Sequence, residues 1–281
     1  LNEAAILAAR AKKQKVNMND ITEARDKVLL GLERRNVTMS DEEKKIVAFH
    51  ESGHALVAAM LPNTDPLYKV TIIPRDKAMG VTMQLPQGDK HLYSKEYLED
   101  RLAVMLGGRA AEDLIFNSVT SGAENDFRES TKLARQMVSA WGMSEKLGPL
   151  ASAGEQRNVF LGEELSRGRE FSEHTAQLID DEIQRFLNQA YDRAKSTLDT
   201  NREALESLAS TLMEREQLSA DELLELLGLG PDGQKDGAKP AKEEDAEPAG
   251  EDSDNDEGQS GQEESAETGS GESGKQAGNS D

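Results

Sequence analysis

Apolar residues recur every three or four positions along most of the first 230 residues, the spacing of one face of a helix. The pattern predicts helices over residues 1–14, 17–31, 38–63, 94–116 and 121–142, and a long helix that begins near Ser172. A segment with four glycines and one proline, residues 143–170, separates the last two of these helices and is predicted to be a loop. We therefore expect a mainly α-helical fold.

Several pairs of residues have the spacing of a capping box, in which two side chains three positions apart satisfy the first free N–H groups of a helix. These pairs are Asp20 with Glu23, Ser40 with Glu43, Thr200 with Glu203, and Ser219 with Glu222. We expect the first residue of each pair to precede a helix. The last pair predicts a short helix that ends before Gly228.

Two short runs rich in β-branched residues interrupt the helical pattern. They are YKVTIIP at residues 68–74 and GVTMQLP at residues 80–86, with RDKAM between them. Such runs, bounded by Pro and Gly, are typical of strands. We expect a small β hairpin or ribbon within the helical domain, and we see no internal repeat.

The C-terminal segment differs in composition from the rest of the chain. From Asp232 to Asp281 there are 16 acidic and 4 basic residues, a net charge of −12 out of −21 for the whole chain. This segment has no Leu, Ile, Val, Met or aromatic residue, so it cannot bury enough apolar surface to offset its chain entropy. We predict that residues 230–281 form a disordered acidic tail.

Composition excludes several classes of site and partner. The sequence contains no cysteine, which excludes disulfides and thiolate metal ligands and suits a reducing compartment. No run of about 18 apolar residues is present, so we expect no transmembrane segment in this chain. An acidic balance without a basic patch argues against nucleic acid as a partner. The chain begins in mid-pattern without a signal peptide, and we expect it to be part of a longer protein.

The predicted helix at residues 38–63 carries the chemistry. In its sequence IVAFHESGHALVAAM, three residues form the pattern H-E-x-x-H: His50, Glu51 and His54. Residues four apart share one helix face, so the two imidazoles point to one site, as zinc requires. Glu51 projects beside that face, where its carboxylate can reach a water on the metal. Zinc would lower the pKa of this water to about 7, and Glu51 would take its proton.

An ordinary structural role for these residues is the alternative. Two polar side chains could lie on the solvent side of an amphipathic helix, but the residues around the motif are largely apolar. A buried cluster of this kind without a partner would cost several kcal/mol. We therefore predict a metal site. Val57 and Met60 stand where the metzincin pattern needs Gly and His, which excludes that class.

A catalytic zinc usually has three protein ligands, so a third must come from elsewhere in the chain. His91 and His174 lie in polar stretches and are expected at the surface. Glu112, in GGRAAEDL, and Asp126, in TSGAENDF, remain as carboxylate candidates. Spacing alone does not decide between these two carboxylates.

Several blocks of sequence, taken in order, resemble the protease domain of the FtsH family. They are AFHESGHALVA, TIIPRDKAMGVTMQLP, LAVMLGGRAAEDL, TSGAENDF, LARQMVSAWGMSEKLGP and FSEHTAQLIDDEI. The resemblance runs from about Arg34 to Leu227 and implies a helical, zincin-like zinc endopeptidase. It also implies that His50, His54 and Asp126 bind one zinc ion per chain and that Glu51 is the catalytic base. Glu112 then becomes a candidate to orient one of the ligand histidines.

The family also implies an organisation and a cellular context. Residues 1–33 resemble the end of an AAA+ lid subdomain, and residues 34–229 the metalloprotease domain. The ATPase core is absent from this chain, since no P-loop pattern occurs, so ATP would be used by another part of the full-length protein. The resemblance further implies a homohexamer that degrades unfolded polypeptides. A membrane anchor missing from this chain would hold it at the cell inner membrane, with the protease domain on the cytoplasmic side.

Two other functions are compatible with parts of the pattern. The chain could be a non-catalytic assembly module, although such a module would typically lose Glu51, which is retained here. It could also be a zinc peptidase of another class, with Glu112 as the third ligand. Substitutions at Glu112 and Asp126 would separate this last possibility from the first.

Overall fold

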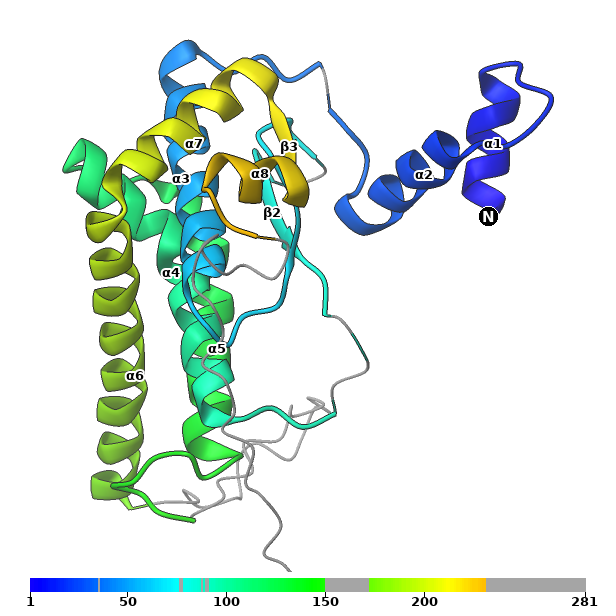
Figure 1. Ribbon diagram of the computed structural model, residues 1–281. Coiled ribbons are helices and arrows are strands. Elements are labelled where there is room, and N and C mark those ends of the chain that lie inside the picture. Colours follow the sequence, from blue (N-terminus) through cyan, green and yellow to red (C-terminus); the bar gives the residue numbers. More distant parts are fainter. Residues whose placement is uncertain (35, 76–77, 87, 89–90, 150–171, 231–281) are drawn as a thin grey trace, which may run out of the picture. The chain divides into compact units, whose positions relative to one another are not determined.

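A computed structural model describes most of the chain and shows a mainly helical protein with one small antiparallel sheet (Figure 1). The described residues are 1–34, 36–75, 78–86, 88, 91–149 and 172–230, and all fall within one compact unit. The predicted acidic tail, apart from its first residue, and most of the predicted loop at 143–170 lie outside them. The mainly α fold with a small β element is confirmed. No helix in the described part of the chain has the length and apolar composition needed to cross a bilayer.

Helix α3, Asp41–Met60, is the predicted motif helix and begins where its capping box lies. The Ser40 hydroxyl accepts a hydrogen bond from the N–H of Glu43, and the Glu43 carboxylate accepts one from the N–H of Ser40. At the other end, the N–H of Leu61 still bonds the carbonyl of Val57. The sequence therefore predicted both ends of this helix to within a few residues.

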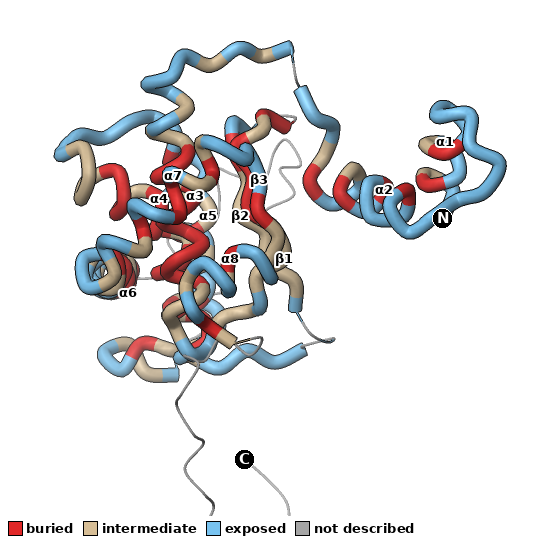
Figure 2. The backbone as a smooth tube through the Cα atoms, turned by 45° about the horizontal axis from the view of Figure 1, so that its top comes forward, coloured by how far each residue is buried: buried red, intermediate tan, exposed pale blue. Residues whose placement is uncertain are grey.

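Helix α4, Lys95–Phe116, packs along α3 at a backbone-to-backbone contact. A Cβ atom on Gly53 would lie 2.4 Å from the carbonyl oxygen of Gly107, so neither helix could approach as closely with a larger residue there. Figure 2 shows that buried residues concentrate on these two helices. Their close approach brings the residues of one helix within reach of side chains on the other.

The other helices surround this pair. Helix α5, Glu124–Ser139, follows a short 3₁₀ turn, Ser121–Ala123, and packs against α4. Helix α6, Glu173–Thr200, packs against α4 and α5, while α7, Arg202–Arg215, packs against α3. A last short helix, α8, is Ala220–Leu226 and has the predicted capping box.

Two of the predicted helix starts were wrong. Helix α2, Met18–Leu30, is capped by Asn17, whose side chain accepts from the N–H of Asp20 at 3.0 Å. Asp20 itself therefore lies inside the first turn and does not pair with Glu23 as a cap. Thr200 ends α6, and its hydroxyl donates to the carbonyl of Ser196 at 2.8 Å. Asn201, without a side-chain cap, precedes α7.

Helix α1 is also shorter than the sequence pattern predicted, since it spans Asn2–Arg10. The positive φ angle of Lys12, 55°, interrupts the helix before the end of the predicted segment 1–14. Helix α2 contacts the small sheet through Asp26. Asp26 accepts hydrogen bonds from the Tyr68 hydroxyl and the Lys69 ammonium, both at 2.5 Å.

The β element is the predicted hairpin with an additional strand. Strand β1, Leu67–Thr71, pairs antiparallel with β2, Val81–Gln84, with Val70 opposite Thr82. Strand β3, Gln217–Ser219, pairs with the other side of β1 and was missed, because three residues carry too little periodicity. The order β2-β1-β3 leaves β2 at an edge of this sheet.

Candidate metal centre

His50 and His54 lie one turn apart on α3, and the Nε2 atoms of their rings face each other. Their Nε2 atoms are 3.0 Å apart, and the rings meet edge to face. Nδ1 of His54 donates to the carbonyl of Val104 at 2.7 Å, and Nδ1 of His50 donates to Oε1 of Glu112, also at 2.7 Å. Because each Nδ1 carries the proton in this arrangement, each Nε2 presents a lone pair to the same point.

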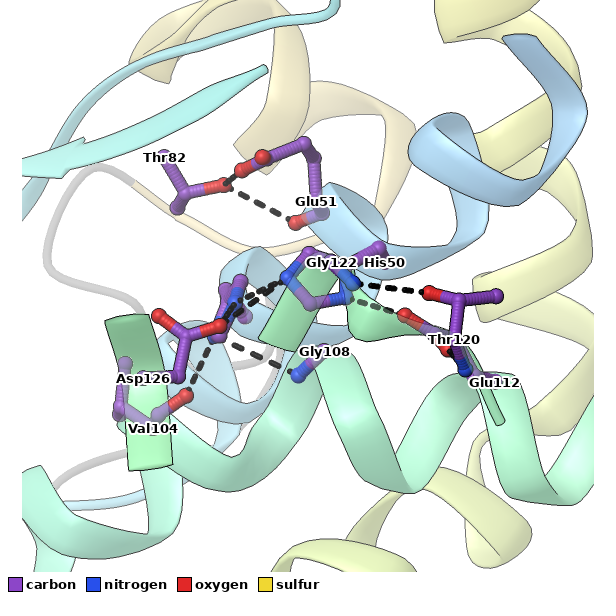
Figure 3. A network of polar contacts seen from close by, with 10 residues as sticks. His50, Glu51, Thr82, Val104, Gly108, Glu112, Thr120, Gly122 and Asp126 are labelled. Carbon is purple, nitrogen blue, oxygen red and sulfur yellow. Dashed lines mark hydrogen bonds and ion pairs between the residues drawn. The ribbon is translucent and has the colours of Figure 1, made fainter. Parts of the chain in front are cut away.

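Asp126 brings a third ligand atom to this point from the first turn of α5. Its Oδ2 lies 3.2 Å from Nε2 of His50 and 3.5 Å from Nε2 of His54. The three ligand atoms all lie within 4.8 Å of one another, and no other such group occurs among the described residues. Figure 3 shows Asp126 and His50 facing each other across the site.

The residues fit a zinc ion. A cation among these three atoms would interact favourably with each of them. Two imidazole nitrogens and one carboxylate oxygen form the kind of three-ligand set that catalytic zinc sites use. Gly108 of α4 leaves the space open, since a Cβ atom there would lie 2.5 Å from Nε2 of His54 and 2.6 Å from Nε2 of His50.

The electrostatics of the site also favour a positive charge. Burial disfavours a charged His50, but hydrogen bonds to Asp126 and Glu112 and the charge of Glu51 raise the pKa of His50 to about 10. Burial likewise disfavours the ionised form of Asp126, yet its contacts with the two histidines hold the pKa of that carboxyl well below its usual range. The acidic groups around the two histidines therefore favour a positive charge at this point.

Glu112 lies behind His50 and not among the converging ligand atoms. Its side chain is 1% exposed; Oε1 contacts Nδ1 of His50, and Oε2 accepts from the N–H of Thr120 at 3.0 Å. Burial would raise the pKa of Glu112, but the hydrogen bonds from His50 and Thr120 bring it below its ordinary value. Its position is that of a group that orients a ligand histidine. His91 and His174 are both exposed and do not belong to the cluster.

Glu51 lies beside the cluster and faces the sheet. Its side chain is largely buried, and Oε2 accepts a hydrogen bond from the Thr82 hydroxyl of β2 at 2.7 Å (Figure 3). Glu51, both histidines and Asp126 line one cleft of about 980 Å³. The carboxylate is therefore in the same cleft as the three ligand atoms without being one of them.

Sequence reasoning missed the contributions of Thr82 and Thr120. Thr120 links Glu112 to α5, because its N–H donates to Glu112 while its hydroxyl accepts from the N–H of Gly122 in the turn that precedes Asp126. Both threonines act through contacts between distant segments. No local pattern in the sequence signals such contacts.

Comparison with known proteins identifies the family. Residues 37–226 match the sequence profile of peptidase family M41, and the chain belongs to this family. "ATP-dependent zinc metalloprotease FtsH 2" of Salinibacter ruber is 51% identical over 227 residues, which cover 81% of this chain and 33% of that protein. "ATP-dependent zinc metalloprotease FtsH" of Nitrosococcus oceani is 51% identical over 223 residues, which cover 79% and 35%. The chain thus spans about a third of the length of these relatives, and the resemblance to the FtsH family is confirmed.

Proposed function

We propose that this chain is a zinc-dependent endopeptidase domain in which His50, His54 and Asp126 bind one zinc ion and Glu51 is the general base. The observation that carries this proposal is the convergence of three lone-pair atoms in an open cleft, with a separate carboxylate beside them. Membership of peptidase family M41 supports it. A structural metal site would be closed by a fourth protein ligand, whereas the described cluster has three.

The metal and the residues around it have separate roles in this reaction. When bound, zinc supplies a Lewis acid that polarises the scissile carbonyl and acidifies water. Glu51 accepts the proton of the attacking water on its carboxylate, and it is free to do so because it is not a ligand. Glu112 holds Nδ1 of His50, and the Val104 carbonyl holds Nδ1 of His54, so that both Nε2 atoms stay directed at the metal.

Strand β2 offers a place for the substrate. It is an edge strand of the sheet, and each of its residues, Val81 to Gln84, lines the same cleft as the metal ligands. An extended polypeptide could pair with its free main-chain groups and lie across the site. This mode of binding suits unfolded polypeptides, because a folded segment could not supply an extended strand.

The wider context is proposed from the family. We infer that residues 1–33 end an AAA+ lid subdomain and that residues 34–229 form the protease domain. The full-length protein would then use ATP in its ATPase domain and degrade unfolded or unassembled proteins as a homohexamer. It would be anchored in the cell inner membrane with this domain on the cytoplasmic side. The ATP-dependent zinc metalloproteases among the relatives support this inference.

Glu51→Gln tests the proposed function. The variant should keep about one zinc per chain, since Glu51 is no ligand, and lose casein cleavage by about 10²-fold or more. Zinc is measured by elemental analysis and cleavage by release of soluble fragments. A Glu51→Gln protein with near-normal turnover would contradict the mechanism. A wild-type chain that binds no metal would favour a non-catalytic assembly module.

A further inference from the structure

The hydroxyl of Thr82 contacts two oxygen atoms of Glu51. It lies 2.7 Å from the carboxylate atom Oε2 and 3.0 Å from the main-chain carbonyl oxygen of Glu51. Figure 3 shows these two contacts between Thr82 and Glu51. The single hydroxyl hydrogen of Thr82 has these two acceptors, and the contact with the carboxylate is the shorter one.

A second element of the same hairpin limits the position of this carboxylate. A Cβ atom on Gly80 would lie 2.6 Å from Oε1 and 2.7 Å from Cγ of Glu51, so the side chain packs directly on the Gly80 backbone. Glu51 is only 6% exposed, and its carboxylate accepts a hydrogen bond from the Thr82 hydroxyl. The Glu51 carboxylate therefore packs against the Gly80 backbone and accepts a hydrogen bond from Thr82.

We propose that Thr82 is a positioning residue for the general base: its hydroxyl fixes the Glu51 carboxylate in the orientation needed to reach the attacking water. This inference rests on the proposed function. A long side chain such as Glu has several rotamers, and a misplacement of about 1 Å can cost a large factor in rate. A charge-assisted hydrogen bond of 2.7 Å is strong enough to select one of them.

The alternative is that Thr82 serves the strand alone. Thr82 pairs with Val70 in the hairpin, and β-branched residues favour strands. Valine has the same shape and keeps this preference but lacks the hydroxyl. Thr82→Val therefore separates the two roles, and Thr82→Ser restores the hydroxyl without the methyl group.

Thr71 provides a matched control in the neighbouring strand. Its hydroxyl donates to the carbonyl of Glu216 at 3.1 Å and accepts from the N–H of Ile73, with no contact to Glu51. Thr71→Val removes a buried hydroxyl from the same sheet. The activity of Thr71→Val per folded molecule measures how the loss of a buried threonine hydroxyl from this sheet affects the reaction when Thr82 is unchanged.

The experiment compares kcat and KM for a fluorogenic peptide, together with zinc per chain, in the 281-residue protein and these variants. We expect Thr82→Val to lower kcat about tenfold or more, to change KM less than twofold, and to keep one zinc per chain. Thr82→Ser should recover kcat to within about threefold of wild type, and Thr71→Val should stay within about twofold.

Three results would overturn the inference. They are a kcat of Thr82→Val close to wild type, a change confined to KM, and a Thr82→Ser variant as slow as Thr82→Val. The last would show that the methyl group, and hence the strand, is what matters. Failure of the proposed function looks different, because wild type and Glu51→Gln would then cleave the peptide equally.

Discussion

Glu112 connects the two halves of the metal centre: its Oε1 lies 2.7 Å from Nδ1 of His50, and its Oε2 lies 3.0 Å from the N–H of Thr120. The Glu112 carboxylate of α4 therefore forms hydrogen bonds with a candidate ligand histidine of α3 and with the loop that leads to Asp126 of α5. Its side chain is buried. This position makes Glu112 a support of the site and argues against the alternative in which it is the third ligand.

Glu112→Gln should weaken zinc binding without abolishing it. The amide can still accept one hydrogen bond, but it lacks the charge that orients and polarises His50, and loss of such a support typically costs 10- to 100-fold in metal affinity. Zinc affinity is measured by competition with a chelator. Activity should return when zinc is added in excess. If Glu112→Gln bound no zinc at any concentration, Glu112 would be a ligand after all.

Gly108→Ala should block the metal site while leaving the helix intact. The new methyl group would lie 2.5 Å from Nε2 of His54, inside the space that a metal must occupy, whereas alanine itself favours helices. We expect zinc content to fall well below one per chain with an unchanged circular dichroism spectrum. Gly88→Ala is the control, because a Cβ atom there meets nothing within 4 Å. Full zinc content in Gly108→Ala would show that the metal lies elsewhere.

Acid should destabilise the protein in part through Glu182, which is buried on α6. Its carboxylate accepts from Arg185 at 2.8 Å and from the Ser144 hydroxyl at 2.6 Å, and lies 3.0 Å from the Lys146 ammonium. The hydrogen bond from Arg185 is the largest cause and outweighs burial; with Ser144 and Lys146 it lowers the pKa of Glu182 to about 2. A folded pKa below the ordinary value stabilises the fold above about pH 4.5. This stabilisation is lost as the pH falls toward 2.

Glu182→Gln should therefore lower the free energy of unfolding by about 1–3 kcal/mol at pH 7, because Ser144, Arg185 and Lys146 lose the charged partner that they share in a buried position. The difference from wild type should shrink as the pH falls below about 4.5. Urea denaturation at a series of pH values measures both effects. Glu145→Gln removes a carboxylate that is 92% exposed and should change stability by less than about 0.5 kcal/mol. A pH-independent difference for Glu182→Gln would contradict the ionic role.

The sequence predicted the parts of the site that depend on one helix. Ser40 and Glu43 start α3, and the spacing of His50 and His54 follows from helix geometry alone. Asp126 is different, because it lies 76 positions from His50 along the chain. Spacing could not distinguish it from Glu112; the resemblance to the FtsH family pointed to Asp126, and the packing of α4 and α5 places it among the converging atoms.

The fold was predictable where elements are long and periodic. Strand β3 has three residues and gains its structure from pairing with β1, so its own sequence carries little signal. The misplaced caps at Asp20 and Thr200 have a similar cause. Asp20 and Thr200 both have the capping-box spacing, but the Asn17 side chain caps α2 instead of Asp20. Thr200 still belongs to α6, where its hydroxyl donates to the Ser196 carbonyl, and Asn201 precedes α7 without a side-chain cap.

Zinc per chain in wild type and Asp126→Ala, with casein cleavage followed in both, tests whether His50, His54 and Asp126 form one catalytic zinc site. We expect about one zinc per wild-type chain, and loss of both metal and activity in the variant. Full zinc content and full activity in Asp126→Ala would contradict it and move the third ligand to another residue.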